Sequence, residues 1–283
     1  MRVLLAEFAP RPGDLERNCR RVEEALESTQ ADLAVFPELF LTGYRLGDRL
    51  HRLAEPAGGP HLSRLAEVAR NHHVAIAVGT VLAASARAGE IHNAAVLLRS
   101  DGSTHVQVKR YLPTYGPFEE GSLFTPTDSS TPTALEDHRV GLEICYDAFF
   151  PEVSRDLALA GADLLVVLSA APVTSGRLFE KVLPARAVEN ALPLVYVNRV
   201  GVEDGMVFGG GSNAWDARGE PLPREEVVVS GLALEEHLWR TEIDLSAHAR
   251  WRPFRPVLRD LSTRPGSSRA SPPSSPPPRT DPL

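Results

Sequence analysis

The sequence predicts a mixed α/β protein with two layers of sheet and helices outside them, and three observations support this fold class. Nine short runs rich in leucine or β-branched residues recur along the chain, each bounded by turn residues. Several runs are apolar at nearly every position, as strands buried on both faces require. Helical patterns lie between some runs and are missing between others, which is typical of a mixed sheet.

The expected elements begin with a strand at 2–8 and a helix that Asp14 can cap. The apolar positions Leu15, Cys19, Val22 and Leu26 follow helical spacing, so Cys19 is expected in the core. Further strands are expected at 32–38, 74–82, 91–99, 105–109, 138–145, 163–169, 192–198 and 226–231, and further helices at 60–72, 149–162 and 176–191, the last with a kink or restart at Pro184.

The chain divides into one domain and a tail. Residues 74–109 read as three strands joined by turns, with no room for a helix between them, which excludes a purely alternating βαβ chain. We assign residues 1–261 to a single domain. Residues 262–283 are dense in proline and serine and have almost no apolar side chains, so they cannot bury enough surface to fold and are predicted to be disordered.

Charge and cysteine content narrow the class of protein. The net charge of -7, with both signs interleaved, argues against nucleic acid or an anionic membrane as the main partner and favours small molecules or proteins. Two cysteines give no disulfide framework, which fits a reducing compartment. The first apolar stretch reads as a strand and not as a signal peptide, and no apolar run could span a bilayer, so we expect a cytoplasmic protein.

Three predicted strands end in residues that can carry chemistry. Glu38, Lys109 and Cys145 each follow an apolar strand directly or within a few residues. The carboxyl ends of strands are where α/β proteins assemble sites from distant parts of the chain, so a carboxylate, an amine and a thiol can meet there. A thiol needs a base to supply thiolate, and a cation stabilises the oxyanion that forms on an attacked carbonyl or nitrile. The backbone N–H of Tyr146 is the expected second oxyanion donor.

The same segments resemble a known family. "FPELFLTGY", "KRYLPTYGPFEEG" and "GLEICYDAFFPE" are similar, in this order, to the glutamate, lysine and nucleophile motifs of the nitrilase superfamily of carbon–nitrogen hydrolases. "RAVEN", "VNRVG" and "FGGGSNAWDARG" resemble further blocks of that superfamily. The resemblance extends over the chain to about residue 260.

The resemblance implies a four-layer α-β-β-α sandwich that forms a homodimer or larger homo-oligomer and needs no cofactor or metal. It implies Glu38 as general base, Lys109 as stabiliser of the tetrahedral intermediate and Cys145 as the nucleophile that forms a thioester. It also implies a second catalytic glutamate. The family spacing favours Glu120, and Glu119 stays open as an alternative one position earlier. The histidines independently lack the spacing of a metal site.

Tyrosine and aspartate after the cysteine resemble the amidase and carbamoylase branches of the superfamily. The expected reaction therefore converts a small amide to a carboxylic acid and ammonia. An N-carbamoyl amine that gives ammonia and carbon dioxide, a nitrile, and a catalytically silent scaffold stay open as alternatives. Tyr44, Tyr115, Phe149 and Ala170 are candidates for the substrate pocket.

Glu143 departs from the family pattern. It lies two residues before Cys145, on the same face of the expected strand, at a position that the family often fills with an apolar residue. Because an unpaired buried carboxylate is costly, Glu143 is expected to pair with an arginine or to face a polar pocket.

Overall fold

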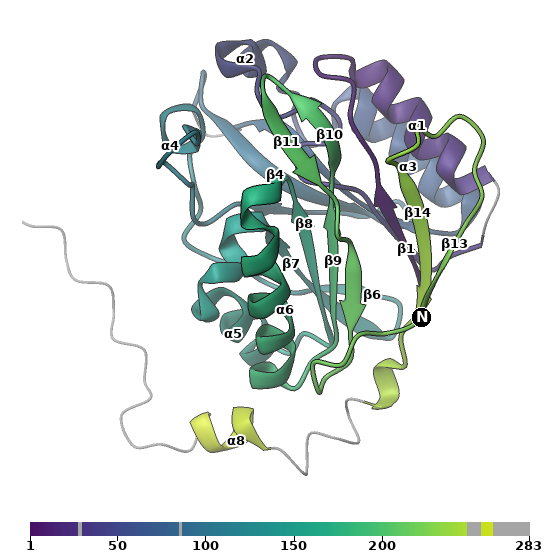
Figure 1. The fold of residues 1–283 in the computed structure, drawn as a ribbon, viewed down its shortest axis with the longest axis vertical. Helices are drawn as coiled ribbons and strands as arrows, with labels where there is room; N and C mark the ends of the chain where they lie inside the picture. The colour runs from purple at the N-terminus through teal and green to yellow at the C-terminus, as the bar shows by residue number, and fades with distance from the viewer. Residues whose placement is uncertain (28–29, 85–86, 248–255, 263–283) are drawn as a thin grey trace, which may run out of the picture.

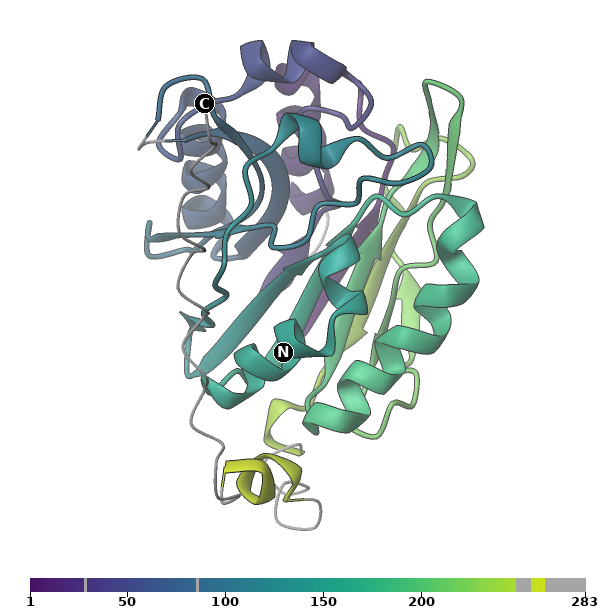
Figure 2. The same cartoon turned by 90° about the vertical axis from the view of Figure 1, so that its left-hand side faces the viewer.

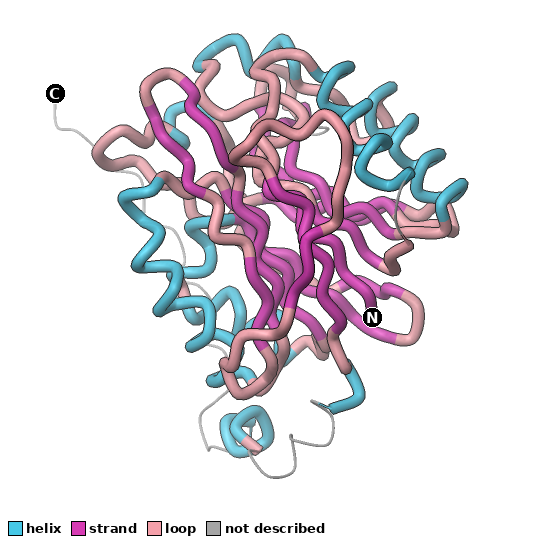
Figure 3. Tube along the Cα trace, turned by 45° about the vertical axis from the view of Figure 1, so that its right-hand side comes forward, coloured by secondary structure: helices cyan, strands magenta, loops and turns pink. Residues whose placement is uncertain are grey.

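A computed structural model describes residues 1–27, 30–84, 87–247 and 256–262. Two sheets pack face to face, and a pair of helices covers the outer side of each sheet, as Figures 1 and 2 show from two directions. The predicted mixed α/β class and its four layers are confirmed. The strands of the two sheets run through the centre of the molecule in Figure 3, and the helices lie at its flanks.

The larger sheet has seven strands in the order β13-β14-β1-β2-β3-β4-β5. Strands β1, β2 and β3 are parallel, and the other neighbours are antiparallel. The segment expected to form three strands without a helix does so as β3, β4 and β5. The bounds are β1 (Arg2–Glu7), β2 (Leu33–Val35), β3 (Ala75–Ala83), β4 (Ile91–Leu98), β5 (Thr104–Val108), β13 (Arg224–Glu226) and β14 (His237–Glu242).

The smaller sheet has five strands in the order β12-β9-β8-β7-β6, with β7, β8 and β9 parallel and the two edge strands antiparallel. A separate hairpin of β10 and β11 follows β9. The bounds are β6 (Thr133–Leu135), β7 (His138–Ile144), β8 (Leu164–Ser169), β9 (Leu194–Asn198), β10 (Val200–Glu203), β11 (Met206–Gly209) and β12 (Asn213–Trp215).

Four helices form the outer layers: α1 (Leu15–Glu27) and α3 (Pro60–His72) on the larger sheet, α5 (Pro151–Leu159) and α6 (Gly176–Asn190) on the smaller. Asp14 caps α1 as predicted, because its carboxylate accepts the Arg17 N–H at 2.9 Å. None of the described helices has the length and apolar character needed to cross a bilayer. The short elements are α2 (Leu50–Leu53), α4 (Glu120–Leu123), α8 (Val257–Ser262), η1 (Gly47–Arg49), η2 (Cys145–Phe149) and η3 (Val173–Ser175).

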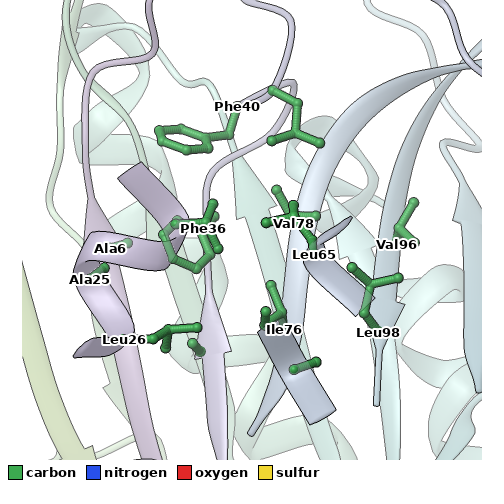
Figure 4. Packing of buried hydrophobic residues seen from close by; sticks show 14 of the residues in the cluster. Ala6, Ala25, Leu26, Phe36, Phe40, Leu65, Ile76, Val78, Val96 and Leu98 are labelled. Carbon is green, nitrogen blue, oxygen red and sulfur yellow. The ribbon is translucent and has the colours of Figure 1, made fainter. Parts of the chain in front are cut away.

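Three of the four apolar clusters formed by the described residues pack sheet against sheet or helix against sheet. Figure 4 shows the cluster under the first pair of helices, where Leu26 of α1 and Leu65 of α3 pack near Phe36 and Ile76 of the larger sheet. A second cluster joins the inner faces of both sheets, and a third lies between the smaller sheet and helices α5 and α6. Because the central strands are covered on both faces, their side chains are apolar at almost every position.

Two sequence predictions about elements were wrong. The strand expected at 226–231 is instead β13, which ends at Glu226, and Val228 is 91% exposed. Of the kink or restart expected at Pro184, the restart is wrong: helix α6 is continuous through the proline, and Leu183 and Ala187 pack into the core on both sides of it. Of the tail predicted to be disordered, Ser262 ends helix α8 and residues 263–283 lie outside the described residues.

Glu143 is a fully buried carboxyl group on β7. Among the described residues it forms no ion pair with an arginine, and it does not line the pocket beside Cys145. Its Oε1 accepts the hydroxyl of Ser154, on helix α5, at 2.7 Å. Its Oε2 has no hydrogen-bond partner among the described residues. Burial is the main cause that raises the pKa of Glu143 to about 7, and the nearby Asp147 carboxyl adds to the effect.

This burial predicts a pH-dependent stability. The pKa of Glu143 in the folded chain is about 7, above its ordinary value of 4.5. The contribution of the protonated Glu143 to the free energy of unfolding is therefore fully present below pH 4.5 and is lost as the pH rises through 7. We expect Glu143→Gln to remove this loss, which corresponds to about 3 kcal/mol for a shift of this size. The measurement is the free energy of unfolding from urea titrations between pH 5 and pH 8.

The control is Glu119→Gln, which changes an exposed carboxylate in the same way. A difference in stability between wild type and Glu143→Gln that stays constant over this pH range would contradict the assignment.

Candidate active site

Glu38 follows β2 after Phe36 and Pro37, and its side chain is buried, with 1% exposed. This segment can lie against β3 because residue 79 is glycine: a Cβ there would come within 2.4 Å of both Pro37 O and Leu39 N. The Gly79 N–H also donates to Pro37 O at 3.1 Å. The missing side chain of Gly79 thereby allows Glu38 to sit deep beneath the end of the strand.

Lys109 lies between two carboxylates and is also 1% exposed. Its Nζ donates to Glu38 Oε1 at 2.6 Å and to Glu120 Oε1 at 2.8 Å. Burial by itself lowers the pKa of Lys109, but the charges of Glu120 and Glu38 outweigh it and hold that pKa above its ordinary value. Lys109 is therefore an ammonium ion at neutral pH.

Glu120, and not the exposed Glu119, is the second glutamate that reaches Lys109. Its Oε1 also accepts the hydroxyl of Tyr44 at 2.5 Å. Burial raises the pKa of Glu120, the Lys109 ammonium opposes this rise, and the Glu38 carboxylate adds to it. Burial, together with the Glu120 and Glu38 charges, also raises the pKa of Tyr44, so its phenol stays protonated and donates.

Two further groups fix the carboxylates. The side chain of Asn93, on β4, donates to Glu38 Oε1 at 2.7 Å and to Glu120 Oε2 at 3.3 Å. The Ala170 N–H donates to Glu38 Oε2 at 2.8 Å, so Ala170 holds Glu38 and does not line the cavity. Sequence reasoning missed Asn93, although a buried amide inside an otherwise apolar strand is a visible signal.

Cys145 begins the short turn η2 where β7 ends. Its backbone has a φ of 48°, a conformation that is uncommon outside glycine. At this residue the side chains stop alternating between the two faces of the sheet. Burial and the Glu38 charge raise the pKa of Cys145, while Lys109 and the Ser169 hydroxyl lower it, with a net rise. The resting side chain is therefore a thiol.

The turn that carries Cys145 is fixed from two directions. The buried carboxylate of Asp147 accepts the N–H groups of Arg110 at 3.1 Å and Tyr111 at 2.8 Å, which joins the turn to the segment after Lys109. Arg186, of helix α6, donates to the carbonyls of Ala148 and Phe149 at 2.8 and 3.0 Å. The sequence used the aspartate after Cys145 only as a mark of the family branch and did not predict that Asp147 holds this turn.

Cys145 lies in the wall of a cavity of about 220 Å³. Of the predicted pocket residues, Tyr44, Tyr115 and Phe149 line this cavity, and so does Tyr146, whose N–H was the expected oxyanion donor. Among the described residues, no group of three or more histidine, cysteine, aspartate or glutamate side chains is arranged to hold a metal ion. Cys19, as predicted, is buried in the core.

A buried ion pair anchors the segment that carries Tyr44. Glu203 accepts the N–H groups of Tyr44 and Arg45 at 2.9 and 2.6 Å and forms an ion pair with the buried Arg199. The Arg199 guanidinium also lies 4.1 Å from the ring centroid of Phe208. The sequence placed Arg199 only within the "VNRVG" block and did not point to Glu203, because Glu203 acts on the backbone of a distant loop.

This arrangement can perform nucleophilic chemistry at a carbonyl. The Cys145 thiol opens onto a cavity. The Glu38 carboxylate near it can accept the thiol proton, and the Lys109 ammonium ion near it can stabilise negative charge. The predicted residues Glu38, Lys109, Glu120 and Cys145 thus come together from four segments of the chain.

Comparisons with known proteins agree with this geometry. The carbon–nitrogen hydrolase family model matches residues 3–253. The chain is 37% identical to an (R)-stereoselective amidase of a Pseudomonas species over 225 residues, which cover 78% of this chain and 80% of that amidase. It is 34% identical to the glutamine-dependent NAD(+) synthetase of Thermotoga maritima over 257 residues, which cover 86% of this chain but only 44% of the synthetase.

A solved structure is similar over nearly its whole length. A variant of the amidase from Nesterenkonia sp. AN1, with acrylamide added to its active-site cysteine, superposes with a TM-score of 0.75 at 28% identity and covers 89% of this chain and 99% of that one. The ordered glutamate, lysine and cysteine motifs, the four layers and the family match together establish that this chain belongs to the carbon–nitrogen hydrolase family.

Proposed function

We propose that the enzyme hydrolyses small carboxamides to a carboxylic acid and ammonia through a thioester on Cys145. The observation that carries this proposal is the Lys109 ammonium buried between Glu38 and Glu120, next to a thiol that opens onto a cavity. A buried ion cluster is costly to build, so its position beside the thiol favours a catalytic role.

In the first half of the reaction, the Cys145 sulfur attacks the amide carbon while Glu38 takes the thiol proton. The base is needed because the raised pKa of Cys145 keeps the thiol protonated at rest. The carbonyl oxygen becomes an oxyanion, which Lys109 and the Tyr146 N–H stabilise. Glu38 returns the proton to the nitrogen, the carbon–nitrogen bond breaks, and ammonia leaves a thioester behind.

In the second half, Glu38 takes a proton from water as the water attacks the thioester carbon. The new oxyanion forms in the same place. Its collapse breaks the carbon–sulfur bond and releases the carboxylic acid, and Glu38 gives its proton to the sulfur, which restores the Cys145 thiol. Glu120 keeps Lys109 charged and in position through both halves. Asn93 orients the two carboxylates, and the Tyr44 phenol supports Glu120.

A second candidate is the supply of ammonia from glutamine to a synthetase reaction. The 34% identity to a glutamine-dependent NAD(+) synthetase favours it. Both candidates use the same thiol chemistry, and they differ in the amide that enters the cavity. The substrate panel below therefore includes glutamine.

We expect Cys145→Ala to lower the rate of ammonia release by at least about 1000-fold, because no other group can form the thioester. The measurement is ammonia release from aliphatic amides, glutamine, N-carbamoyl amines and nitriles. Cys19→Ala is the matched control, and it should keep the activity because Cys19 lies in the core. Activity that survives in Cys145→Ala would contradict the proposal, and carbon dioxide released with the ammonia would indicate a ureido substrate.

We expect Glu38→Gln to lower kcat by about 10²–10⁴-fold, which is the usual contribution of a general base. The glutamine keeps the shape of the side chain but accepts no proton. The variant should still fold, and iodoacetamide should still alkylate Cys145, as peptide mass spectrometry would report. Retention of more than a tenth of wild-type kcat would show that another group is the base.

A further inference from the structure

The wall of the Cys145 cavity is apolar and carries no charge. Among the described residues that line it, none has an ionisable acidic or basic side chain apart from the thiol and the phenols. Aromatic rings make up much of the wall: Tyr115, Phe118, Tyr146, Phe149 and Phe179. Several of these rings pack edge to face or tilted at centroid distances between 4.9 and 5.8 Å, so the wall is built of interlocked aromatic side chains.

The mouth of the cavity is apolar as well. Leu178, on α6, and Tyr115 line the cavity and are 52% and 54% exposed. The charged groups of the site are already paired: Lys109 is shared between Glu38 and Glu120. A carboxylate on the far end of a substrate would lose part of its water against this apolar wall and meet no cation in it, which is unfavourable.

The cavity suits a small acyl group. Its volume of about 220 Å³ is below the range of pockets that enclose drug-sized ligands. A short hydrocarbon chain or a single aromatic ring is therefore favoured over a larger group.

We propose that the enzyme selects amides whose acyl group is an uncharged hydrocarbon, and that it rejects amides that carry a second carboxylate. Glutamine, the monoamides of dicarboxylic acids and N-carbamoyl amino acids fall in the rejected class. This inference rests on the proposed function, because it takes Cys145 as the point of attack.

The first test compares two amides of nearly equal length, hexanamide and glutaramate, the monoamide of glutaric acid. We expect kcat/KM for hexanamide to exceed that for glutaramate by at least about 100-fold, because the wall offers no partner for the carboxylate. Glutamine should be as poor a substrate as glutaramate. A kcat/KM for glutaramate or glutamine equal to or above that for hexanamide would overturn the inference.

The second test adds a cation to the wall. Leu178→Arg places a guanidinium at the mouth of the cavity, and half of the leucine side chain is exposed, so the fold should tolerate it. We expect the ratio of kcat/KM for glutaramate to that for hexanamide to rise at least about tenfold. Val228→Arg adds the same charge at an exposed residue away from the cavity and should leave the ratio unchanged. An unchanged ratio in Leu178→Arg would overturn the assignment of this wall to the acyl group.

A third measurement does not need turnover. Each amide is tested for its ability to slow the alkylation of Cys145 by iodoacetamide, followed by mass spectrometry. Protection by hexanamide and not by glutaramate supports the inference, and equal protection by both overturns it. If hexanamide protects Cys145 but no amide is hydrolysed, the proposed function fails while the selectivity of the cavity stands.

Discussion

The Lys109 ammonium buried between Glu38 and Glu120 is the interaction on which the rest of the structure depends. A charge this deeply buried is tolerated only when its partners and their remaining hydrogen bonds are complete. The fold supplies them from distant places: Glu38 from the end of β2, Glu120 from the start of α4, and the Asn93 amide from β4. A shift between these strands would leave a carboxylate or the ammonium ion unpaired. The geometry of the site therefore depends on the register of the strands in the larger sheet.

The same cluster explains how a thiol with a raised pKa can react. Lys109 is held as an ammonium ion by its two carboxylates, so its charge is present before the substrate arrives. Glu38 shares one oxygen with Lys109 and Asn93, and the Ala170 N–H binds the other, which fixes the carboxylate beneath the cavity. Positive charge and base are thus preorganised around a neutral nucleophile, and no part of the cluster has to reorganise during attack.

The sequence predicted the parts of the site that interrupt an apolar pattern. Glu38, Lys109 and Cys145 are visible because each comes at the end of an apolar strand. The structural roles of Asp147 and Glu203 were missed because these carboxylates bind backbone N–H groups of distant segments, and no local pattern reports such contacts. The two layers of sheet could be predicted from the apolar runs. Strand β14 was missed because charged residues alternate with its apolar ones. The valines at 227–229 were predicted to form a strand, although Val228 is exposed to solvent.

The measurement that tests the account most directly asks whether an amide and an ester of the same acid pass through one acyl-enzyme. Both substrates are hydrolysed in the presence of hydroxylamine, and the ratio of hydroxamate to free acid is measured for each. We expect the same ratio for both, because water and hydroxylamine compete for a single thioester on Cys145, and we expect Cys145→Ala to form neither product. Ratios that depend on the leaving group would contradict the thioester mechanism.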